Sequence, residues 1–178
     1  MIYIGYDIGS SSVKAAVVDA KTGKALAVAT SPSSEMAIKA TQPSFAEQDP
    51  ELWWQHLIRA THEVLQNANV SGEDVKGIGL AYQMHGLVCL DAQQNVLRDA
   101  IIWCDSRAVG IGDKAAEEIG EETCLSGLLN LPGNFTASKL KWVKENEPEI
   151  YSRIHKIMLP GDFVGMKLTG DIVTTISG

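Results

Sequence analysis

The first thirty residues alternate between hydrophobic and polar positions in the pattern of three short strands. β-Branched and other apolar residues recur at residues 2–6, 13–18 and 25–30, and polar turns separate the three runs. Strands that follow one another through short turns pair as an antiparallel meander. The chain is therefore expected to open with a three-stranded antiparallel sheet.

A helix is predicted from residue 50 to about residue 69. Asp49 is suited to the N-cap, Pro50 to the first helical position, and Glu51 adds an acid to the first turn. Apolar and small residues then recur at helical spacing, at Trp53, Leu57, Thr61, Val64, Leu65 and Ala68. Trp53 and Trp54 are interpreted as packing residues, because aromatic side chains dominate core energetics.

A further strand is predicted at residues 75–81. Its residues 77–81 carry no charge, which is typical of a strand buried in the centre of a sheet. The helix between this strand and the meander predicts a right-handed parallel crossover. Residues 31–47 form a polar connector with Pro32 and Pro43, and loops of this length are often functional.

The remaining sequence predicts short strands mixed with helices. Extended segments are expected at 87–90, 96–97, 101–103 and 172–176, and a buried strand at 154–159. Helices are expected at 108–118, 136–146 and 162–168, with Pro148 stopping or restarting the second of them. Glycines punctuate residues 120–133. The whole pattern indicates an α/β fold with a mixed sheet and flanking helices.

Composition and charge narrow the classes of function. With 178 residues, the chain is expected to be one domain, or one large and one incomplete domain. Its net charge of −7 argues against broad nucleic-acid binding, which needs a basic surface. An anionic substrate would therefore need backbone donors, a local cation or Mg²⁺. The N-terminus has no signal-peptide pattern, and no apolar run is long enough for a membrane span, so a cytoplasmic protein without a membrane partner is expected.

The three cysteines lack the spacing of a metal site. Cys89, Cys104 and Cys124 are widely separated, and each lies among apolar residues. They are interpreted as small buried hydrophobic residues.

The first turn of the meander has the chemistry of a phosphate site. Gly9 lets a ligand approach the backbone closely, and backbone N–H groups together with the hydroxyls of Ser10, Ser11 and Ser12 can surround phosphate oxygens. Asp7 is placed at the end of a strand to hold a hydrated Mg²⁺. The alternative is an ordinary hairpin turn rich in turn-forming residues.

A second candidate site follows the strand predicted at 75–81. Gln83 and His85 come just beyond its carboxyl end, where ligands bind in open α/β sheets. Gln83 offers a donor and an acceptor, and His85 can do either near neutral pH. The alternative is that His85 has only a structural role.

Five motifs in fixed order give the sequence a family resemblance. Residues 7–14 (DIGSSSVK) resemble the first phosphate motif of the actin, hexokinase and sugar-kinase superfamily. They are followed by AEQDPELWW at 46–54, QMHG at 83–86, IWCDSR at 102–107 and LPGNFTASKLKW at 131–142. The series resembles the N-terminal lobe of the FGGY carbohydrate kinases over essentially the whole chain. Met84 and His85 stand where glycerol-phosphorylating members carry an Arg-Glu pair, so the members that act on xylulose are the most similar.

The resemblance implies a ribonuclease-H-like lobe of the actin and hexokinase ATPase type. Residues 1–178 would be the sugar-binding lobe, and the family's second, adenine-binding lobe has no counterpart in this chain. The implied reaction is phosphoryl transfer from ATP, with Mg²⁺, to a ketopentose, in particular to O5 of D-xylulose. The implied partners are the sugar and ATP, and the resemblance leaves a homodimer open.

The resemblance also assigns roles to individual residues. Met84 and His85, beside Gln83, would touch the sugar, with Trp103 and Asp105 at the border of its pocket. Asp7 would lie near the phosphates and the metal. Gly9, Ser10, Ser11, Ser12 and Lys14 would face the ATP phosphates, although Lys14 stands where glycerol kinases carry Arg and so lacks the planar fork of a guanidinium group. The family's catalytic base lies in the second lobe, and no acid of this chain matches it by motif.

Two other interpretations stay open at this point. One is a lobe of a sibling kinase that acts on ribulose, fuculose or gluconate, and the other is a non-catalytic sugar-binding module. Coding sequence beyond Gly178 would argue against the module, and a substrate panel would separate the kinases.

Overall fold

The computed structural model describes residues 1–175 and divides the chain into two compact units. The first unit comprises residues 1–37, 50–83 and 160–173. The second comprises residues 38–49 and 84–159, together with the last residues of the chain. Within residues 1–175, no helix is long and apolar enough to cross a membrane.

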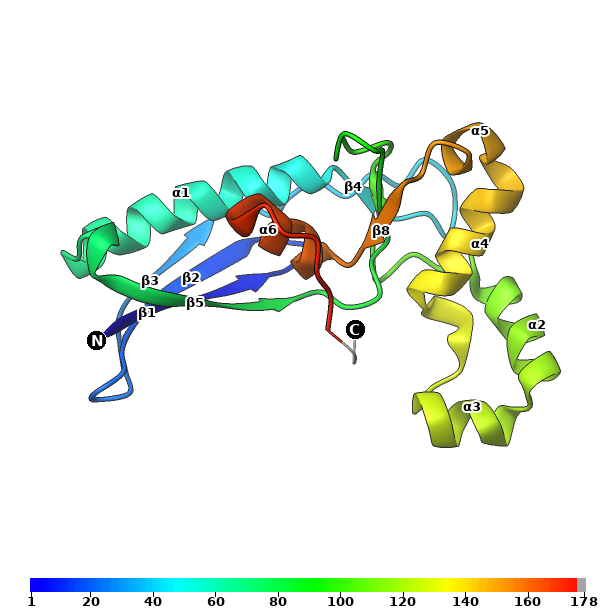
Figure 1. Cartoon of the computed structure of the whole chain (residues 1–178), viewed down its shortest axis with the longest axis horizontal. Coiled ribbons are helices and arrows are strands. Elements are labelled where there is room, and N and C mark those ends of the chain that lie inside the picture. Colours follow the sequence, from blue (N-terminus) through cyan, green and yellow to red (C-terminus); the bar gives the residue numbers. More distant parts are fainter. Residues whose placement is uncertain (176–178) are drawn as a thin grey trace. The chain divides into compact units, whose positions relative to one another are not determined.

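The first unit is built on a four-stranded sheet with the order β3-β2-β1-β5 (Figure 1). Its strands are β1 (Ile2–Ile8), β2 (Val13–Asp19), β3 (Lys24–Ser31) and β5 (Val75–Tyr82). The first three pair in antiparallel fashion, and β5 pairs with β1 in parallel. The predicted meander and the parallel crossover are therefore confirmed.

Helix α1 (Pro50–Ala68) covers one face of this sheet, where it packs against β2 and β3 (Figure 1). Alternate residues of the first two strands are buried, namely Ile4, Tyr6, Ile8, Val13, Ala15 and Val17. The hydroxyls of Tyr6 and Thr61 lie 2.7 Å apart and join β1 to the helix. Trp53 is fully buried, which confirms its packing role.

The prediction that β5 is buried at the centre of the sheet is wrong. β5 is an edge strand whose residues are half-buried or exposed, and helix α6 (Pro160–Thr169) packs against it. Gly161 of α6 lies so close to Tyr82 that a Cβ atom there would stand 2.0 Å from the ring. An uncharged run indicates a strand, but it does not report how many neighbours the strand has.

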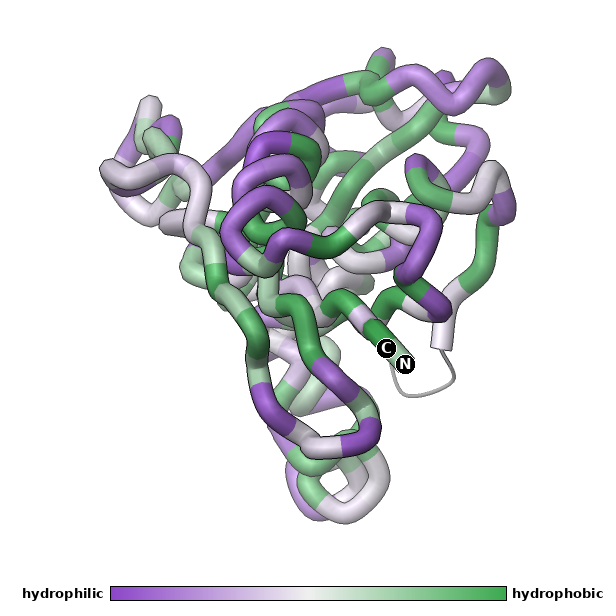
Figure 2. Tube along the Cα trace, turned by 90° about the vertical axis from the view of Figure 1, so that its left-hand side faces the viewer, coloured by the Kyte–Doolittle hydropathy of each residue, from purple (hydrophilic) through white to green (hydrophobic). Residues whose placement is uncertain are grey.

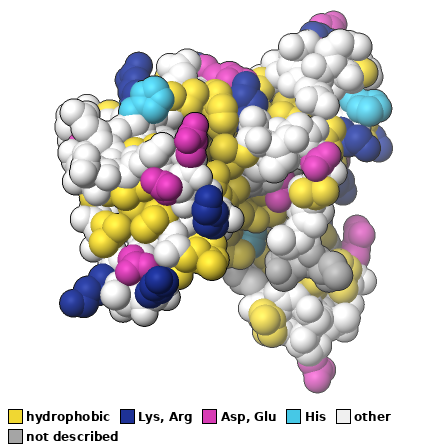
Figure 3. Space-filling view, turned by 60° about the vertical axis from the view of Figure 1, so that its left-hand side comes forward, with side chains coloured by type: hydrophobic (Ala, Val, Ile, Leu, Met, Phe, Trp, Pro, Cys, Tyr) yellow, Lys and Arg dark blue, Asp and Glu magenta, His cyan; other side chains and the backbone are white. Residues whose placement is uncertain are grey.

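The strands of the first unit also carry exposed hydrophobic side chains: Tyr3, Leu26, Val28 and Ile78 are between 39% and 57% exposed. Figure 3 shows hydrophobic side chains gathered on the viewed face of the molecule, among scattered charged ones. Hydrophobic and hydrophilic positions also alternate along the chain trace in Figure 2.

The second unit combines two short antiparallel pairs with a group of helices. β4 (Glu47–Gln48) pairs with β7 (Ala100–Ile101), and β6 (Val88–Leu90) pairs with β8 (Lys156–Met158). The helices are α2 (Val109–Ile119), α3 (Glu121–Leu128), α4 (Thr136–Asn146) and α5 (Pro148–Tyr151). Short 3₁₀ turns are η1 (Gly72–Asp74), in the first unit, and η2 (Pro132–Asn134). One cluster of buried residues in this unit consists of Leu87, Cys89, Ile101 and Val143.

Several boundaries in the second unit differ from the prediction. Residues 121–128 of the glycine-punctuated segment form helix α3. Gly120, with φ at +94°, stands just before the helix, and the glycine inside the helix does not prevent its hydrogen bonding. The strand predicted at 154–159 is shorter and mostly exposed, since only Met158 of β8 is buried. Pro148 restarts a helix, at α5. Residues 172–175 are not in a strand, and Ile176 lies outside the described residues.

Candidate functional site

The candidate phosphate turn joins β1 to β2 in the first unit. Its ends are fixed by the pairs Asp7–Lys14 and Ile8–Val13 in the register of the two strands. The backbone N–H of Gly9 donates to the Ser12 carbonyl at 3.0 Å and closes the turn. That N–H is therefore not free for a phosphate.

The three serines lie at the tip of this turn. Ser11 is exposed, whereas Ser10 and Ser12 are half-buried. The Ser11 carbonyl accepts a hydrogen bond of 2.7 Å from the backbone N–H of Met36, which anchors the start of the connector to the turn.

Asp7 and Lys14 form a salt bridge at the base of the turn. Nζ of Lys14 lies 3.4 Å from Oδ2 of Asp7, and both side chains are more than half exposed. Ion pairs this exposed contribute little stability, so each partner can be exchanged for a ligand charge. Residues 1–175 contain no group of three His, Cys, Asp or Glu side chains that could hold a metal ion. A single exposed carboxylate fits a Mg²⁺ ion that keeps most of its ligands as water and phosphate oxygens.

His85 lies in the loop that follows β5, and its backbone is left-handed, with φ at +60°. Its ring stacks on Phe135, with ring centroids 5.2 Å apart and planes at 28°. Burial, and secondarily the charge of Lys139, lower the pKa of His85. The imidazole is therefore neutral at pH 7, and one ring nitrogen can donate while the other accepts.

The neighbours of His85 in the sequence differ in exposure. Met84 is 57% exposed. The side-chain amide of Gln83, at the end of a segment of the first unit, is buried and has no hydrogen-bond partner among the described residues. Buried amides are nearly always paired in native structures, so Gln83 is a candidate for bonding a ligand.

Trp103 is 48% exposed, and its carbonyl accepts a hydrogen bond of 2.5 Å from Nδ2 of Asn134. Cys104 beside it is exposed, so the prediction that all three cysteines are buried is wrong at this position. Cys89 and Cys124 are fully buried, as predicted. The chain makes a turn at residues 103–105. The alternation of apolar and polar residues in the sequence could not predict that turn.

Asp105 does not share the exposure of its neighbour. Its side chain is fully buried and binds the Arg107 guanidinium through both oxygens, with a shortest distance of 2.7 Å. The same carboxylate accepts a hydrogen bond of 2.6 Å from the backbone N–H of Ala46. Asp105 thus holds the connector to the segment 103–107, and its oxygens already have protein partners.

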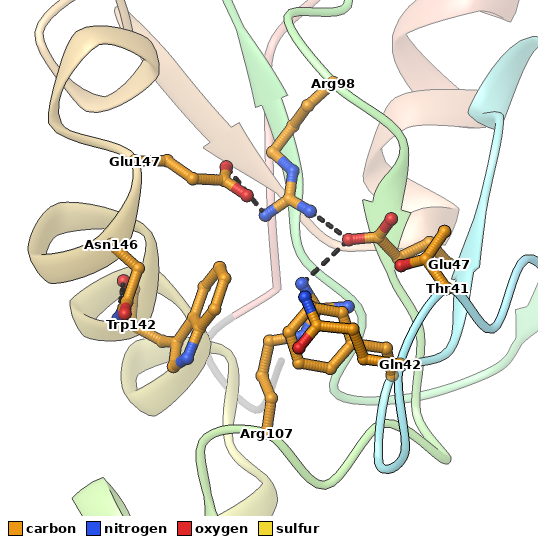
Figure 4. Close-up of a pocket in the computed structure, with 9 residues that line it drawn as sticks. Thr41, Gln42, Glu47, Arg98, Arg107, Trp142, Asn146 and Glu147 are labelled. Atoms are coloured by element: carbon orange, nitrogen blue, oxygen red, sulfur yellow. Dashed lines mark hydrogen bonds and ion pairs between the residues drawn. The ribbon is translucent and has the colours of Figure 1, made fainter.

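Arg107 is also part of a network of charged side chains (Figure 4). Glu47 binds both Arg98 and Arg107, the latter at 2.8 Å, and Arg98 also binds Glu147 at 3.2 Å. The Arg107 guanidinium lies 3.6 Å from the centroid of the Phe45 ring. These residues line an open pocket of about 490 Å³. The sequence analysis did not predict this network. The charged residues inside otherwise apolar motifs could have indicated it.

Lys139 was also missed. Its side chain is 0% exposed, and Nζ donates to the carbonyls of His85 at 2.8 Å and Asn134 at 3.1 Å. Burial lowers the pKa of Lys139 to about 8. Lys139 precedes the buried Val143 by four residues and so lies on the same face of α4. This spacing could have indicated that Lys139 is buried.

Comparison with known proteins identifies the family. Residues 2–178 match the FGGY family of carbohydrate kinases, N-terminal domain. A protein of Escherichia coli (strain K12) named xylulose kinase is 38% identical over 176 residues, and one of Bacillus subtilis (strain 168) with the same name is 37% identical over 179. These matches cover 99% and 98% of this chain, but only 35% and 34% of the relatives.

Solved structures agree with these matches. The crystal structure of a xylulose kinase from Rhodospirillum rubrum has a TM-score of 0.86 at 27% identity, and it covers 97% of this chain and 35% of that one. A kinase from Brucella ovis, whose structure is titled "xyloylose kinase", also reaches 0.86, at 34% identity and over 96% of this chain and 35% of that one. The fold class predicted from the sequence, the α/β lobe of the actin and hexokinase ATPase type, is confirmed. The chain spans about a third of the length of these relatives, and it belongs to the FGGY family of carbohydrate kinases, whose N-terminal domain it contains.

Proposed function

We propose that this chain supplies the sugar site and the phosphate turn of an enzyme that phosphorylates a ketopentose with ATP, converting D-xylulose to D-xylulose 5-phosphate. The observation that carries the proposal is the His85 loop. It presents a neutral imidazole in a fixed backbone conformation, within a chain 38% identical to a protein named xylulose kinase.

Most of the residues predicted for the sugar have a place in this proposal. His85 hydrogen-bonds a sugar hydroxyl, because its ring offers a donor and an acceptor. The side-chain amide of Gln83 offers both as well, and it has no hydrogen-bond partner among the described residues. Met84 and Trp103 offer exposed apolar surface to the carbon side of the sugar. Asp105 shapes the pocket border through Arg107 and the connector, without reaching the sugar itself.

The phosphate turn supports the other substrate. Lys14 leaves its weak pair with Asp7 to bind a phosphate oxygen, and the serine hydroxyls of the turn donate to others. Asp7 is then free to bind water molecules of Mg²⁺, which neutralises phosphate charge when it is bound. Phosphoryl transfer depends mainly on such positioning and charge stabilisation. The proton of the sugar hydroxyl must pass to a base, and Asp105, with both oxygens occupied, is not that base.

A substrate panel tests the proposal. The full gene product, meaning the polypeptide that the gene encodes whether it ends at Gly178 or continues, is assayed for ADP formation with ATP, Mg²⁺ and D-xylulose, ribulose, fuculose or gluconate. The highest kcat/KM is expected with D-xylulose. A clear preference for another of these sugars would transfer the proposal to a sibling kinase, and sugar binding without turnover would indicate a non-catalytic module. A homodimer remains a prediction, and the mass of the purified protein in solution would decide it.

A further inference from the structure

The amine of Lys139 is the most deeply buried cationic group whose role the proposed function leaves unexplained. Its side chain is 0% exposed. Its hydrogen-bond partners among residues 1–175 are two backbone carbonyls, those of His85 and Asn134, and not a carboxylate. Burying an ammonium group is costly unless its donors are paired, so a lysine at such a position needs a reason. The lowered pKa of Lys139, about 8, reflects the same cost.

The first carbonyl belongs to a residue under backbone strain. His85 has φ at +60°, a conformation that side-chain-bearing residues adopt at a cost. Such a residue keeps it only where the surroundings hold it there. Lys139 Nζ binds its carbonyl at 2.8 Å, and the Thr136 hydroxyl binds the next carbonyl, that of Gly86, at 3.3 Å. Both donors come from α4.

The second carbonyl leads to another part of the candidate sugar site. Asn134 accepts from Lys139 through its backbone oxygen and donates through its side chain to the Trp103 carbonyl, at 2.5 Å. One ammonium group therefore connects the loop that carries His85 with the segment that carries Trp103. Phe135, which follows Asn134, forms the surface on which the imidazole stacks.

We propose that Lys139 is a positioning residue of the sugar site: its ammonium group fixes the backbone of His85 and Asn134, and through them the directions of the imidazole and of Trp103. This inference rests on the proposed function and extends it to a residue that does not touch the sugar. A purely packing role would be filled equally well by an apolar side chain of the same length, and this gives the test.

Lys139→Met keeps the length of the side chain and removes its donors. Lys141→Met is the matched control, because Lys141 lies on the same helix and is 58% exposed, and its ion pair within residues 1–175 is with Glu145, at 3.9 Å. Both variants are made in the full gene product. KM values for D-xylulose and for ATP, melting temperature and hydrogen–deuterium exchange of residues 83–87 are compared with the parent protein.

We expect Lys139→Met to raise the KM for the sugar by about tenfold or more, the effect of losing roughly one charged hydrogen bond. The KM for ATP should stay within about twofold, and exchange at residues 83–87 should become faster, whereas Lys141→Met changes neither. Lys139→Gln, which keeps one donor group, should give an intermediate KM for the sugar. If Lys139→Met is too unstable to purify, this second variant carries the comparison.

Two results would overturn the inference. One is a sugar KM equal to that of the control, whatever the melting temperature. The other is an equal rise in both KM values, which would show general loss of structure. Failure of the proposed function looks different, since the parent protein would then phosphorylate none of the sugars. In that case the exchange rates decide whether Lys139 fixes the His85 loop, and unchanged rates would reject it.

Discussion

A methyl group at Gly112 should separate two elements that the second unit needs in contact. Gly112 lies in α2, and a Cβ atom there would stand 2.2 Å from Cα and 2.3 Å from N of Gly133, in η2. These are backbone atoms, so no side chain can rotate away. Since carbon atoms pack at about 3.5–4.0 Å, Gly112→Ala must move α2 and η2 apart by more than ~1 Å.

The magnitude follows from two opposing effects. Overpacking costs about 1–3 kcal/mol, and a clash between backbone segments belongs at the upper end of that range. Alanine favours a helix over glycine by about 1 kcal/mol, which offsets part of the cost. We therefore expect Gly112→Ala to lower the free energy of unfolding by ~2 kcal/mol. With an m-value of about 2 kcal/mol/M, the urea midpoint should fall by roughly 1 M.

Gly110→Ala is the matched control. Gly110 lies in the same helix, and a Cβ atom there would meet no atom within 4 Å. Urea unfolding followed by tryptophan fluorescence should show this variant as stable as the parent or slightly more so. If Gly112→Ala were as stable as Gly110→Ala, the close contact of α2 with η2 would be refuted.

Four further predictions concern single groups. His85→Ala should raise the KM for the sugar while leaving that for ATP unchanged, at a cost of about 1–3 kcal/mol, and an unchanged sugar KM and kcat would return His85 to a structural role. Asp7→Asn should lower kcat severely while calorimetric binding of D-xylulose survives; equal losses would mean that Asp7 supports the fold. Because the folded pKa of Lys139 is about 8 against a usual 10.5, the unfolded chain binds more protons between these values, so the free energy of unfolding should rise with pH across that window, and Lys139→Met should lack this rise. Alkylation followed by intact mass should label only the exposed Cys104 in the native protein and all 3 cysteines after denaturation; labelling of Cys89 or Cys124 without denaturant would contradict their burial.

The sequence predicted the first unit well, because its pattern is local. Strands β1 to β3 follow one another through short turns, and α1 begins at Pro50, where the N-terminal signals placed it. The edge position of β5 could not be predicted from a local pattern. A run such as residues 75–81 has the same composition whether the strand has one neighbouring strand or two.

For the candidate site, the sequence motifs pointed to residues whose roles stay predictions, and they did not point to the groups that hold those residues in place. His85 and Trp103 belong to motifs, and the structure gives both of them partly or largely exposed side chains. Asp105 looked like a pocket acid, yet Arg107 and Ala46 occupy its carboxylate. Which distant group satisfies a buried charge is a matter of tertiary packing, and neither spacing nor periodicity records it.

The edge position of β5 has a consequence for handling the 178-residue polypeptide. Among the described residues, no strand pairs with its outer side, so the backbone donors and acceptors that face that side between Lys76 and Ala81 form a row with no partner strand. Such a row is a template on which another extended segment can add, and natural proteins discourage this with charges. β5 carries a single charged residue, Lys76, and an exposed Ile78. Concentrated solutions of the polypeptide should thus tend towards strand addition between molecules, and dilution should favour the monomer.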